Sequence, residues 1–219
     1  RGITPYHFDP SLLTQRKQLI RGRLGEIVTN RIIEKDNRLV KHSEIKDCLV
    51  EVDNYDNKQK ISIQSGDILC ELRNFRLEKK QVEFDDGVFL FKGNIDLTND
   101  ASNHDNVSFN LKKSQLVFLD STVDFSNLTI NGGSDLFLHD VLWSGVLNFI
   151  RSQVVSTGGI NVYDSSSEDA LNFVSSNSEI NKIIVSRSLS DGIDVDFGSF
   201  KVGSIKCKKI GNDCLDTSA

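Results

Sequence analysis

The chain has 219 residues, of which 38% are hydrophobic and 26% charged, and its formal net charge is −5. This length suits one elongated domain or two small compact ones, and no apolar run approaches the roughly 18 residues that a membrane-spanning helix needs. Residues 1–50 hold ten Lys and Arg against six Asp and Glu, so the remainder is acidic and lacks the basic stripe with interleaved aromatics that a nucleic-acid partner requires.

Residues 1–44 differ from the rest of the chain and predict an N-terminal cap or linker segment. Both prolines lie in the first ten residues, and residues 11–35 combine an apolar stripe with basic side chains on the other side. The apolar members are Leu12, Leu13, Leu19, Ile20, Leu24, Ile27 and Val28. We expect this segment to cover the end of the strands that follow, because an uncovered edge leaves backbone groups unpaired. A partner-binding or interdomain segment is the alternative.

From about residue 45, short runs of alternating apolar and polar residues predict strands separated by polar breaks. The predicted strands are Leu49–Val52, Lys60–Ile63, Ile68–Leu72, Gln81–Phe84, Val88–Phe91, Asn94–Leu97, Val107–Leu111, Leu116–Leu119, Val123–Ile130 and Leu136–His139. Residues 98–106 form the most polar break and predict a long loop. The match of Val50–Val52 to Cys70–Leu72 at a 20-residue step indicates irregular coils from residue 45.

The stretch from Ser167 to Ser218 repeats itself twice. Glu168–Phe173 (EDALNF) matches Ser190–Val195 (SDGIDV) and then Asn212–Thr217 (NDCLDT), with a step of 22 residues each time. A period of 20 to 25 residues is typical of a solenoid, in which each repeat buries its apolar face against its neighbours. A leucine-rich repeat has a similar period, but its consensus leucine spacing is missing here.

The predicted fold is therefore all-β, a right-handed parallel β-helix of about 22 residues per coil with an N-terminal cap. It occupies residues 45–219 and has regular coils over 107–219. The pattern stops at Ala219 in mid-repeat, so we expect a fragment of a longer chain that carries further coils or domains. The four cysteines show no metal-binding spacing, and we expect them to be small buried apolar residues of the stacked coils: Cys48, Cys70, Cys207 and Cys214.

Alternation assigns faces to the repeated strands. The side chains expected inside are Leu171, Phe173, Ile193, Val195, Phe197, Leu215 and Thr217. The side chains expected outside are Ala170, Asn172, Val174, Gly192, Asp194, Asp196, Cys214, Asp216 and Ser218.

In this register Asp194 and Asp216 lie side by side about 5 Å apart, with Asp196 on the same face. Two carboxylates at that distance repel by about 3 kcal/mol at an effective dielectric constant of 20, so a cation, a shared proton or a nearby base is expected to offset them. One reading is a Ca²⁺ site of Asp194, Asp196 and Asp216. A second is an acid/base pair for sugar chemistry, drawn from these residues and Asp191 and Asp213. The third is a solvated acidic face.

The leading aspartates of the repeats, Asp169, Asp191 and Asp213, fall at the turn before each strand, where a short carboxylate commonly accepts backbone N–H bonds. This structural role needs no catalysis. Arg187 and Lys208 lie in or just after the second strand of the coil, as do Lys206 and Lys209. They are candidates for binding an acidic polysaccharide or for a lyase base, and a charged solvent face is the alternative.

On these motifs the chain resembles the right-handed parallel β-helix (pectin-lyase-like) superfamily, well over 107–219 and loosely over 45–106. Ser190–Phe197 (SDGIDVDF) and Gly211–Asp216 (GNDCLD) resemble the repeated coils of bacterial envelope-type proteins, some of which accompany CotH-like (spore-coat kinase-like) domains. That resemblance implies a fold and an extracellular or envelope location, and it implies no settled activity.

A weaker resemblance is to the polygalacturonase-type glycoside hydrolases. Leu189–Gly192 (LSDG) and Asn212–Cys214 (NDC) are similar to their two catalytic motifs, which would make Asp191 and Asp213 the catalytic carboxylates. Asn212 departs from that pattern, and the Gly-His-Gly and Arg-x-Lys motifs are absent.

We expect a β-helix of the cell envelope or exterior that binds polysaccharide along its strand face, without a nucleic-acid partner. The alternative is a carbohydrate-active enzyme, a hydrolase or a lyase, that uses Asp191, Asp194, Asp213 and Asp216. A third option is a structural spacer in a larger surface protein. Long solenoid faces suit extended ligands, because successive coils present matching groups at a fixed spacing.

Overall fold

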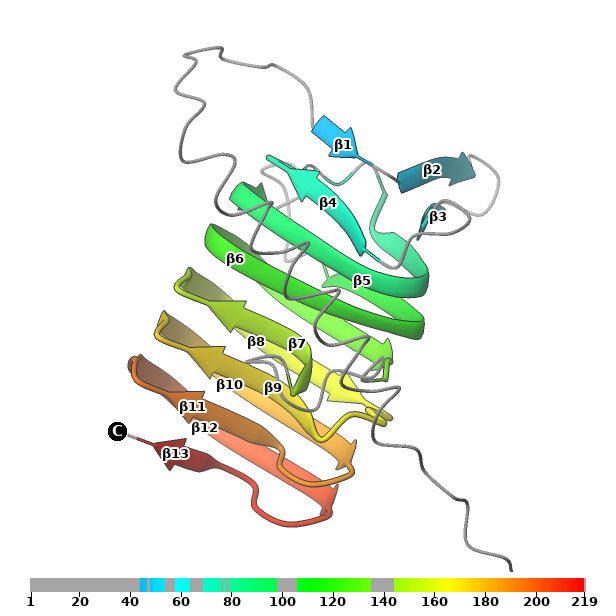
Figure 1. The fold of residues 1–219 in the computed structure, drawn as a ribbon. Helices are drawn as coiled ribbons and strands as arrows, with labels where there is room; N and C mark the ends of the chain where they lie inside the picture. The colour runs from blue at the N-terminus through cyan, green and yellow to red at the C-terminus, as the bar shows by residue number, and fades with distance from the viewer. Residues whose placement is uncertain are drawn as a thin grey trace, which may run out of the picture.

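The computed structural model describes residues 44–46, 48–53, 58–63, 69–75, 77, 79–97, 106–134 and 144–218. These residues form strands and turns that stack as a parallel β-solenoid of about 6 turns (Figure 1). None of them belongs to a helix long and apolar enough to cross a membrane. The predicted all-β parallel solenoid is confirmed. The right-handed sense of winding stays a prediction, and residues 1–43 of the predicted cap lie outside the described residues.

Thirteen described strands belong to one continuous sheet. In chain order they are β1 (Glu44–Lys46), β2 (Cys48–Asp53), β3 (Lys58–Ile63), β4 (Leu69–Arg73), β5 (Gln81–Asp96), β6 (Asn106–Gly132), β7 (Gly145–Ile150), β8 (Gln153–Tyr163), β9 (Asp169–Val174), β10 (Asn177–Ser188), β11 (Ile193–Asp196), β12 (Ser199–Ile210) and β13 (Asp216–Ser218). Every strand predicted up to residue 130 falls within one of these elements, apart from the outermost residues Ile68 and Leu97, and the predicted strand Leu136–His139 lies outside the described residues.

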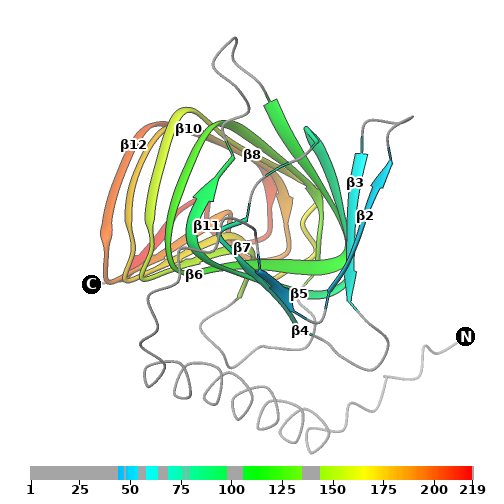
Figure 2. The same ribbon diagram turned by 90° about the horizontal axis from the view of Figure 1, so that it is seen from above.

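The long strands β5 and β6 bend around the coil. Their first parts, residues 81–85 and 108–112, continue the sheet from β3, and their later parts contribute to two further walls. Wall A contains β4, residues 87–91 of β5, residues 114–119 of β6, and then β7, β9, β11 and β13. Wall B contains residues 93–96 of β5, residues 121–131 of β6, and then β8, β10 and β12. Seen along the solenoid, β8, β10 and β12 lie on the side opposite β4, β7 and β11 (Figure 2).

The coils are longer than the sequence repeat indicated, about 24 residues on average. Phe173 pairs with Val195 at the predicted step of 22, whereas Phe149 pairs with Phe173 at a step of 24. Phe118 pairs with Phe149, 31 residues away. The strands stay in register while the period changes.

The N-terminal end of the described solenoid does not contain the parallel coils expected from residue 45. β2 runs antiparallel to β3, and β1 runs antiparallel to β4. The 20-residue match of Val50–Val52 to Cys70–Leu72 therefore predicted the wrong pairing. Parallel stacking begins where β3 and β4 meet β5.

Both pairs of cysteines form disulfides, which corrects the expectation of free apolar cysteines. Cys48 is bonded to Cys70 across 22 residues, and Cys207 to Cys214 across 7. No free cysteine remains. One bond joins β2 to β4 and the other joins β12 to the turn before β13, so the two disulfides lie at the two ends of the described solenoid. End coils have a stacked neighbour on one side only, and a cross-link limits the unfolded alternatives of such a segment.

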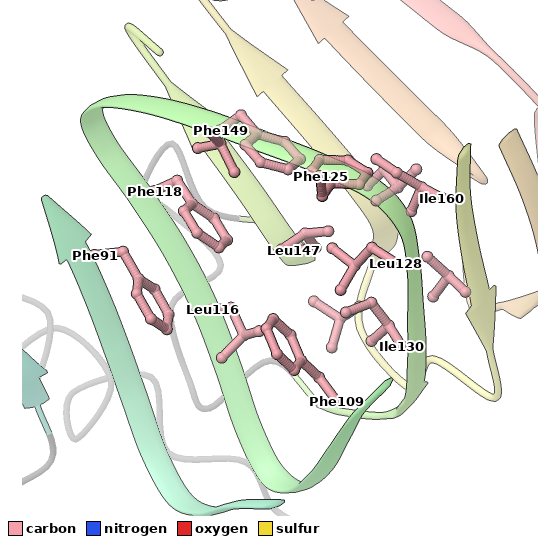
Figure 3. Packing of buried hydrophobic residues seen from close by; sticks show 14 of the residues in the cluster. Phe91, Phe109, Leu116, Phe118, Phe125, Leu128, Ile130, Leu147, Phe149 and Ile160 are labelled. Carbon is pink, nitrogen blue, oxygen red and sulfur yellow. The ribbon is translucent and has the colours of Figure 1, made fainter. Parts of the chain in front are cut away.

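The core inside the walls is built on a ladder of phenylalanines. Phe91, Phe118, Phe149 and Phe173 occupy one register position on successive strands of wall A (Figure 3). Their ring centroids lie 4.6, 5.1 and 5.0 Å apart, in stacked geometry. All four are buried, and each such pair adds about 0.5–1.5 kcal/mol to the burial of its apolar area.

The corner from wall A to wall B has the same left-handed backbone conformation in four successive coils. Its residues have positive φ angles: Asp120 (50°), Arg151 (47°), Ser175 (49°) and Phe197 (52°). This left-handed conformation reverses the strand direction and points the side chain outward. Phe197, predicted to face the core, is 65% exposed for that reason.

A serine follows three of these corner residues, and its hydroxyl links neighbouring coils. The Ser152 hydroxyl donates to the Phe118 carbonyl at 3.0 Å and accepts the Ser121 N–H at 3.1 Å. The Ser176 hydroxyl repeats both bonds, to the Phe149 carbonyl at 2.9 Å and from the Ser152 N–H at 3.0 Å. The buried backbone groups of the corner are thus satisfied by the next coil.

We predict that Ser152→Ala lowers the free energy of unfolding by about 1–3 kcal/mol, because it leaves a buried N–H and a buried carbonyl without this partner. Urea denaturation followed by circular dichroism measures the change. The control is Ser204→Ala, since Ser204 is exposed on β12 and should change stability by less than about 0.5 kcal/mol. Equal effects of the two substitutions would contradict the serine ladder.

Candidate functional site

One outward row of wall A changes its chemistry along the solenoid. The residues in register are Leu90, Val117, Asn148, Asn172, Asp194 and Asp216. The first four are buried, Asp194 is half-buried and Asp216 is exposed. The predicted adjacency of Asp194 and Asp216 is confirmed. The outward residues Ala170, Asn172 and Val174, however, are at most 5% exposed, so wall A is buried on both faces up to β9, as strands with continuous apolar runs require.

Asp169 is a buried carboxyl beside this row. It is 3% exposed and hydrogen-bonded to the Ser144 hydroxyl, which in turn accepts a bond of 2.8 Å from the Asn172 amide. Burial raises the pKa of Asp169 from 3.8 to about 7, and the negative charges of Asp194, Glu168 and Asp191 add to the rise. The Ser144 bond opposes the rise in part. Asp169 therefore holds a proton at slightly acid pH.

Asp194 is the second carboxyl with a displaced pKa. Its pKa rises from 3.8 to about 6, chiefly through burial and also through repulsion from Asp196, Asp216 and Asp191, while the Val195 N–H bond opposes the rise. Protonation of Asp194 below about pH 6 reduces the repulsion within the acidic row.

Asp191 has the turn-stabilising role predicted for the leading aspartates. Its Oδ1 accepts the backbone N–H of Asp213 at 2.8 Å and the Asn212 amide at 3.0 Å. Its Oδ2 accepts the Ser190 hydroxyl at 3.3 Å. The carboxylate therefore joins one coil to the next. Asp213 is exposed and accepts a bond of 3.2 Å from the Asn212 amide, a side-chain donor in place of the expected backbone N–H.

Within the described residues, no three His, Cys, Asp or Glu side chains are placed to hold a metal ion together. Asp194 and Asp216 are register neighbours, and Asp196 pairs with Ser218. A Ca²⁺ site of Asp194, Asp196 and Asp216 stays a prediction, since the described residues do not bring these three carboxylates together around one point.

The basic candidates lie away from the aspartates. Lys206 and Lys208 are exposed on β12 of wall B, where they pair in register with Ile184 and Ser186. Arg187 stands at a corner with a φ of 85° and contacts Asp164 at 3.4 Å. The outward aspartates belong to wall A. The structure thus separates the predicted acidic cluster from the predicted basic residues.

The outer face of wall B holds a feature that the sequence reasoning missed. An open depression of about 110 Å³ crosses three coils at the start of β8, β10 and β12. It is lined by Gln153, Val154, Val155, Asn177, Ser178, Glu179, Ser199 and Lys201. Gln153, Asn177 and Ser199 are in register with one another, as are Val155, Glu179 and Lys201. The only sequence signal is the 22-residue step from Asn177 to Ser199, because these side chains share polarity and not identity.

No protein-family model, curated protein or solved structure matches this chain. The β-solenoid fold is therefore shown by the geometry of this structure alone. No relative supports the resemblance to named β-helix families.

We predict that the stability of the protein falls between about pH 4 and pH 7 through the titration of Asp169. The folded pKa is about 7 against 3.8, so in this window the unfolded chain releases the proton more readily and stability declines as pH rises. Asp169→Asn removes the share of this decline that Asp169 causes and raises the free energy of unfolding at pH 8 by up to roughly 4 kcal/mol. A smaller decline below about pH 6 remains, because the pKa of Asp194 is also raised. Urea denaturation at a series of pH values measures both effects, and a decline as large in the variant as in the unmodified protein would contradict this assignment.

Proposed function

We propose that this protein binds an extended polysaccharide along the outer face of wall B and does not cleave it. The observation that carries the proposal is the open depression in which three successive coils present Gln153, Asn177 and Ser199 side by side. Amide and hydroxyl groups both donate and accept hydrogen bonds, which suits the hydroxyls of a sugar. All three side chains are exposed, so a ligand reaches them without any movement of the fold.

Polar groups extend beyond the depression on the same face. Thr122 of β6 continues the Gln153 row, and Asn161 lies further along β8. Tyr163, at the end of β8, is 37% exposed and offers an aromatic ring beside these groups. The rows repeat at the strand spacing of about 4.8 Å, so a polymer lying along the solenoid meets similar groups at each coil.

We further propose that the protein acts outside the cytoplasm and belongs with the right-handed parallel β-helix (pectin-lyase-like) proteins of envelope type. Two disulfides with no free cysteine support an oxidising environment. The stacked coils and the SDGIDVDF pattern of Ser190–Phe197 support the family placement.

Affinity electrophoresis and calorimetry against a panel of neutral and charged polysaccharides test the binding. We expect saturable binding that Gln153→Ala/Asn177→Ala weakens about thirtyfold, the effect of losing two hydrogen bonds of about 1 kcal/mol each. The control is Gln81→Ala/Asn106→Ala, since these residues have the same types and are exposed at the starts of β5 and β6. Binding that is equal in both variants would place the ligand elsewhere, and a panel without any binding would overturn the proposal.

A second candidate function is glycoside hydrolysis by Asp194 and Asp216, favoured by the raised pKa of Asp194, about 6. Register places the two residues on adjacent strands, about 4.8 Å apart at the backbone. Retaining glycosidases hold an acid and a nucleophile about 5–5.5 Å apart. Asp194 would then protonate the glycosidic oxygen while the Asp216 carboxylate attacks the sugar carbon.

Release of reducing sugars from the same panel tests this candidate. The hydrolase requires activity that falls on the alkaline side near pH 6, where Asp194 loses its proton. Asp194→Asn would lower that activity by at least about a hundredfold, with Asp124→Asn, an outward aspartate of wall B, as the control. Activity retained in Asp194→Asn would exclude this site, and a panel without turnover leaves binding as the function.

A further inference from the structure

The outer surface of β10 and β12 carries five exposed lysines, which we call the lysine face: Lys182, Lys201, Lys206, Lys208 and Lys209. β10 and β12 are adjacent parallel strands. Register pairs these lysines with uncharged residues in most cases, as Lys182 with Ser204 and Lys206 with Ile184. The lysine face therefore extends over two adjacent strands, β10 and β12.

None of the five lysines makes an ion pair with any residue that the structure describes. On the other coils some lysines are paired, as Lys60 with Asp85 at 3.4 Å and Lys112 with Glu83 at 2.8 Å, whereas Lys113 of β6 has no ion pair within the described residues. Glu179 is the sole acidic residue within β10 and β12; it lies in register with Lys201 and forms no ion pair within the described part of the chain. The lysine face is thus a local positive surface on a chain of net charge −5.

This arrangement costs free energy in the isolated protein. Lys206 and Lys208 point to the same side and lie about 7 Å apart along the strand, so they repel by roughly 0.6 kcal/mol even in water. Carboxylates are plentiful in the same coils, but Asp194, Asp196 and Asp216 belong to wall A. The last coils therefore separate the two charge signs on opposite walls. A surface with uncompensated charge of one sign attracts ligands of the other.

We propose that the lysine face binds the anionic groups of a carboxylate-bearing polysaccharide. The inference rests on the proposed function and names the class of glycan. Lys201 borders the depression, while Lys206 and Lys208 lie further along β12, so the lysine face continues the proposed sugar site. Across seven residues of strand the lysines span about 23 Å, and a ligand that contacts all of them is several sugar units long.

The neighbouring groups favour a glycan over a nucleic acid. Single-stranded nucleic acids are held by aromatic side chains on which successive bases stack. Phe200 is the one aromatic residue within β10 and β12, and it packs against the core. Hydroxyls of Ser204 and Ser186 lie in register with Lys182 and Lys208, and the exposed amide and hydroxyl of Asn177 and Ser199 begin the same strands.

Calorimetry with sodium alginate, neutral dextran and single-stranded DNA, in low salt with a chelator present, tests the proposal. We expect alginate to bind more tightly than dextran or DNA, and long alginate more tightly than its disaccharide. Lys182→Gln/Lys206→Gln/Lys208→Gln should weaken alginate binding about tenfold or more and flatten its dependence on salt. The control Lys60→Gln/Lys112→Gln/Lys113→Gln removes the same charge from β3 and β6 and should leave alginate binding unchanged.

The outcomes separate this inference from the proposed function. Dextran bound through Gln153 and Asn177 as tightly as alginate would overturn the lysine face and leave the polysaccharide site standing. DNA bound as tightly as alginate would also overturn it, since the surface would then recognise any polyanion. Alginate binding that depends on the lysines but not on Gln153 and Asn177 would support the lysine face and reject the depression. Binding of no glycan would reject both.

Discussion

The register between coils is the constraint on which the rest of this structure depends. Each wall consists of parallel strands whose backbone hydrogen bonds place equivalent residues of successive coils side by side. The phenylalanine ladder, the serine ladder and the row from Asn148 to Asp216 all follow from that one alignment. A slip of one residue would exchange the inner and outer faces of a strand, so it would expose the phenylalanines and bury the aspartates together.

The same register brings like groups together, and the protein compensates in different ways. Stacked phenylalanines gain from contact, and stacked serines satisfy one another's backbone. Stacked carboxylates repel, and here a raised pKa reduces the charge of Asp169 and Asp194. Asp191 is compensated differently, because it accepts the Asp213 N–H and the Asn212 amide. The exposed lysines of β12 are neighbours along one strand. Within the described residues no ion pair or side-chain hydrogen bond offsets their charge, so a bound anion is the best explanation for them.

The sequence repeat correctly predicted the features that depend only on the register between strands. The 22-residue step correctly placed Asp194 beside Asp216, and alternation correctly placed Leu171 and Val195 inside. It failed where the backbone leaves the strand conformation: Phe197 has a positive φ and turns outward. It also failed for the cysteines, because Cys48 meets Cys70 through antiparallel strands that the coil period does not describe. The depression escaped notice because Gln153, Asn177 and Ser199 share chemistry without sharing a residue type.

Walls A and B differ in the accessibility of their polar groups, and this difference favours wall B over the aspartates as the functional surface. Of the carboxylates in the repeat, Asp194 and Asp196 are half-buried, and Asp191 is hydrogen-bonded to the next coil. An acid/base mechanism also needs its groups beside a site that a sugar ring can enter, and Asp169 is buried too deeply for that. On wall B the polar side chains are exposed and in register over three coils, and the lysines beside them form no ion pairs within the described residues. Binding requires only that polar groups are accessible and regularly spaced, and the polar groups of wall B meet both requirements.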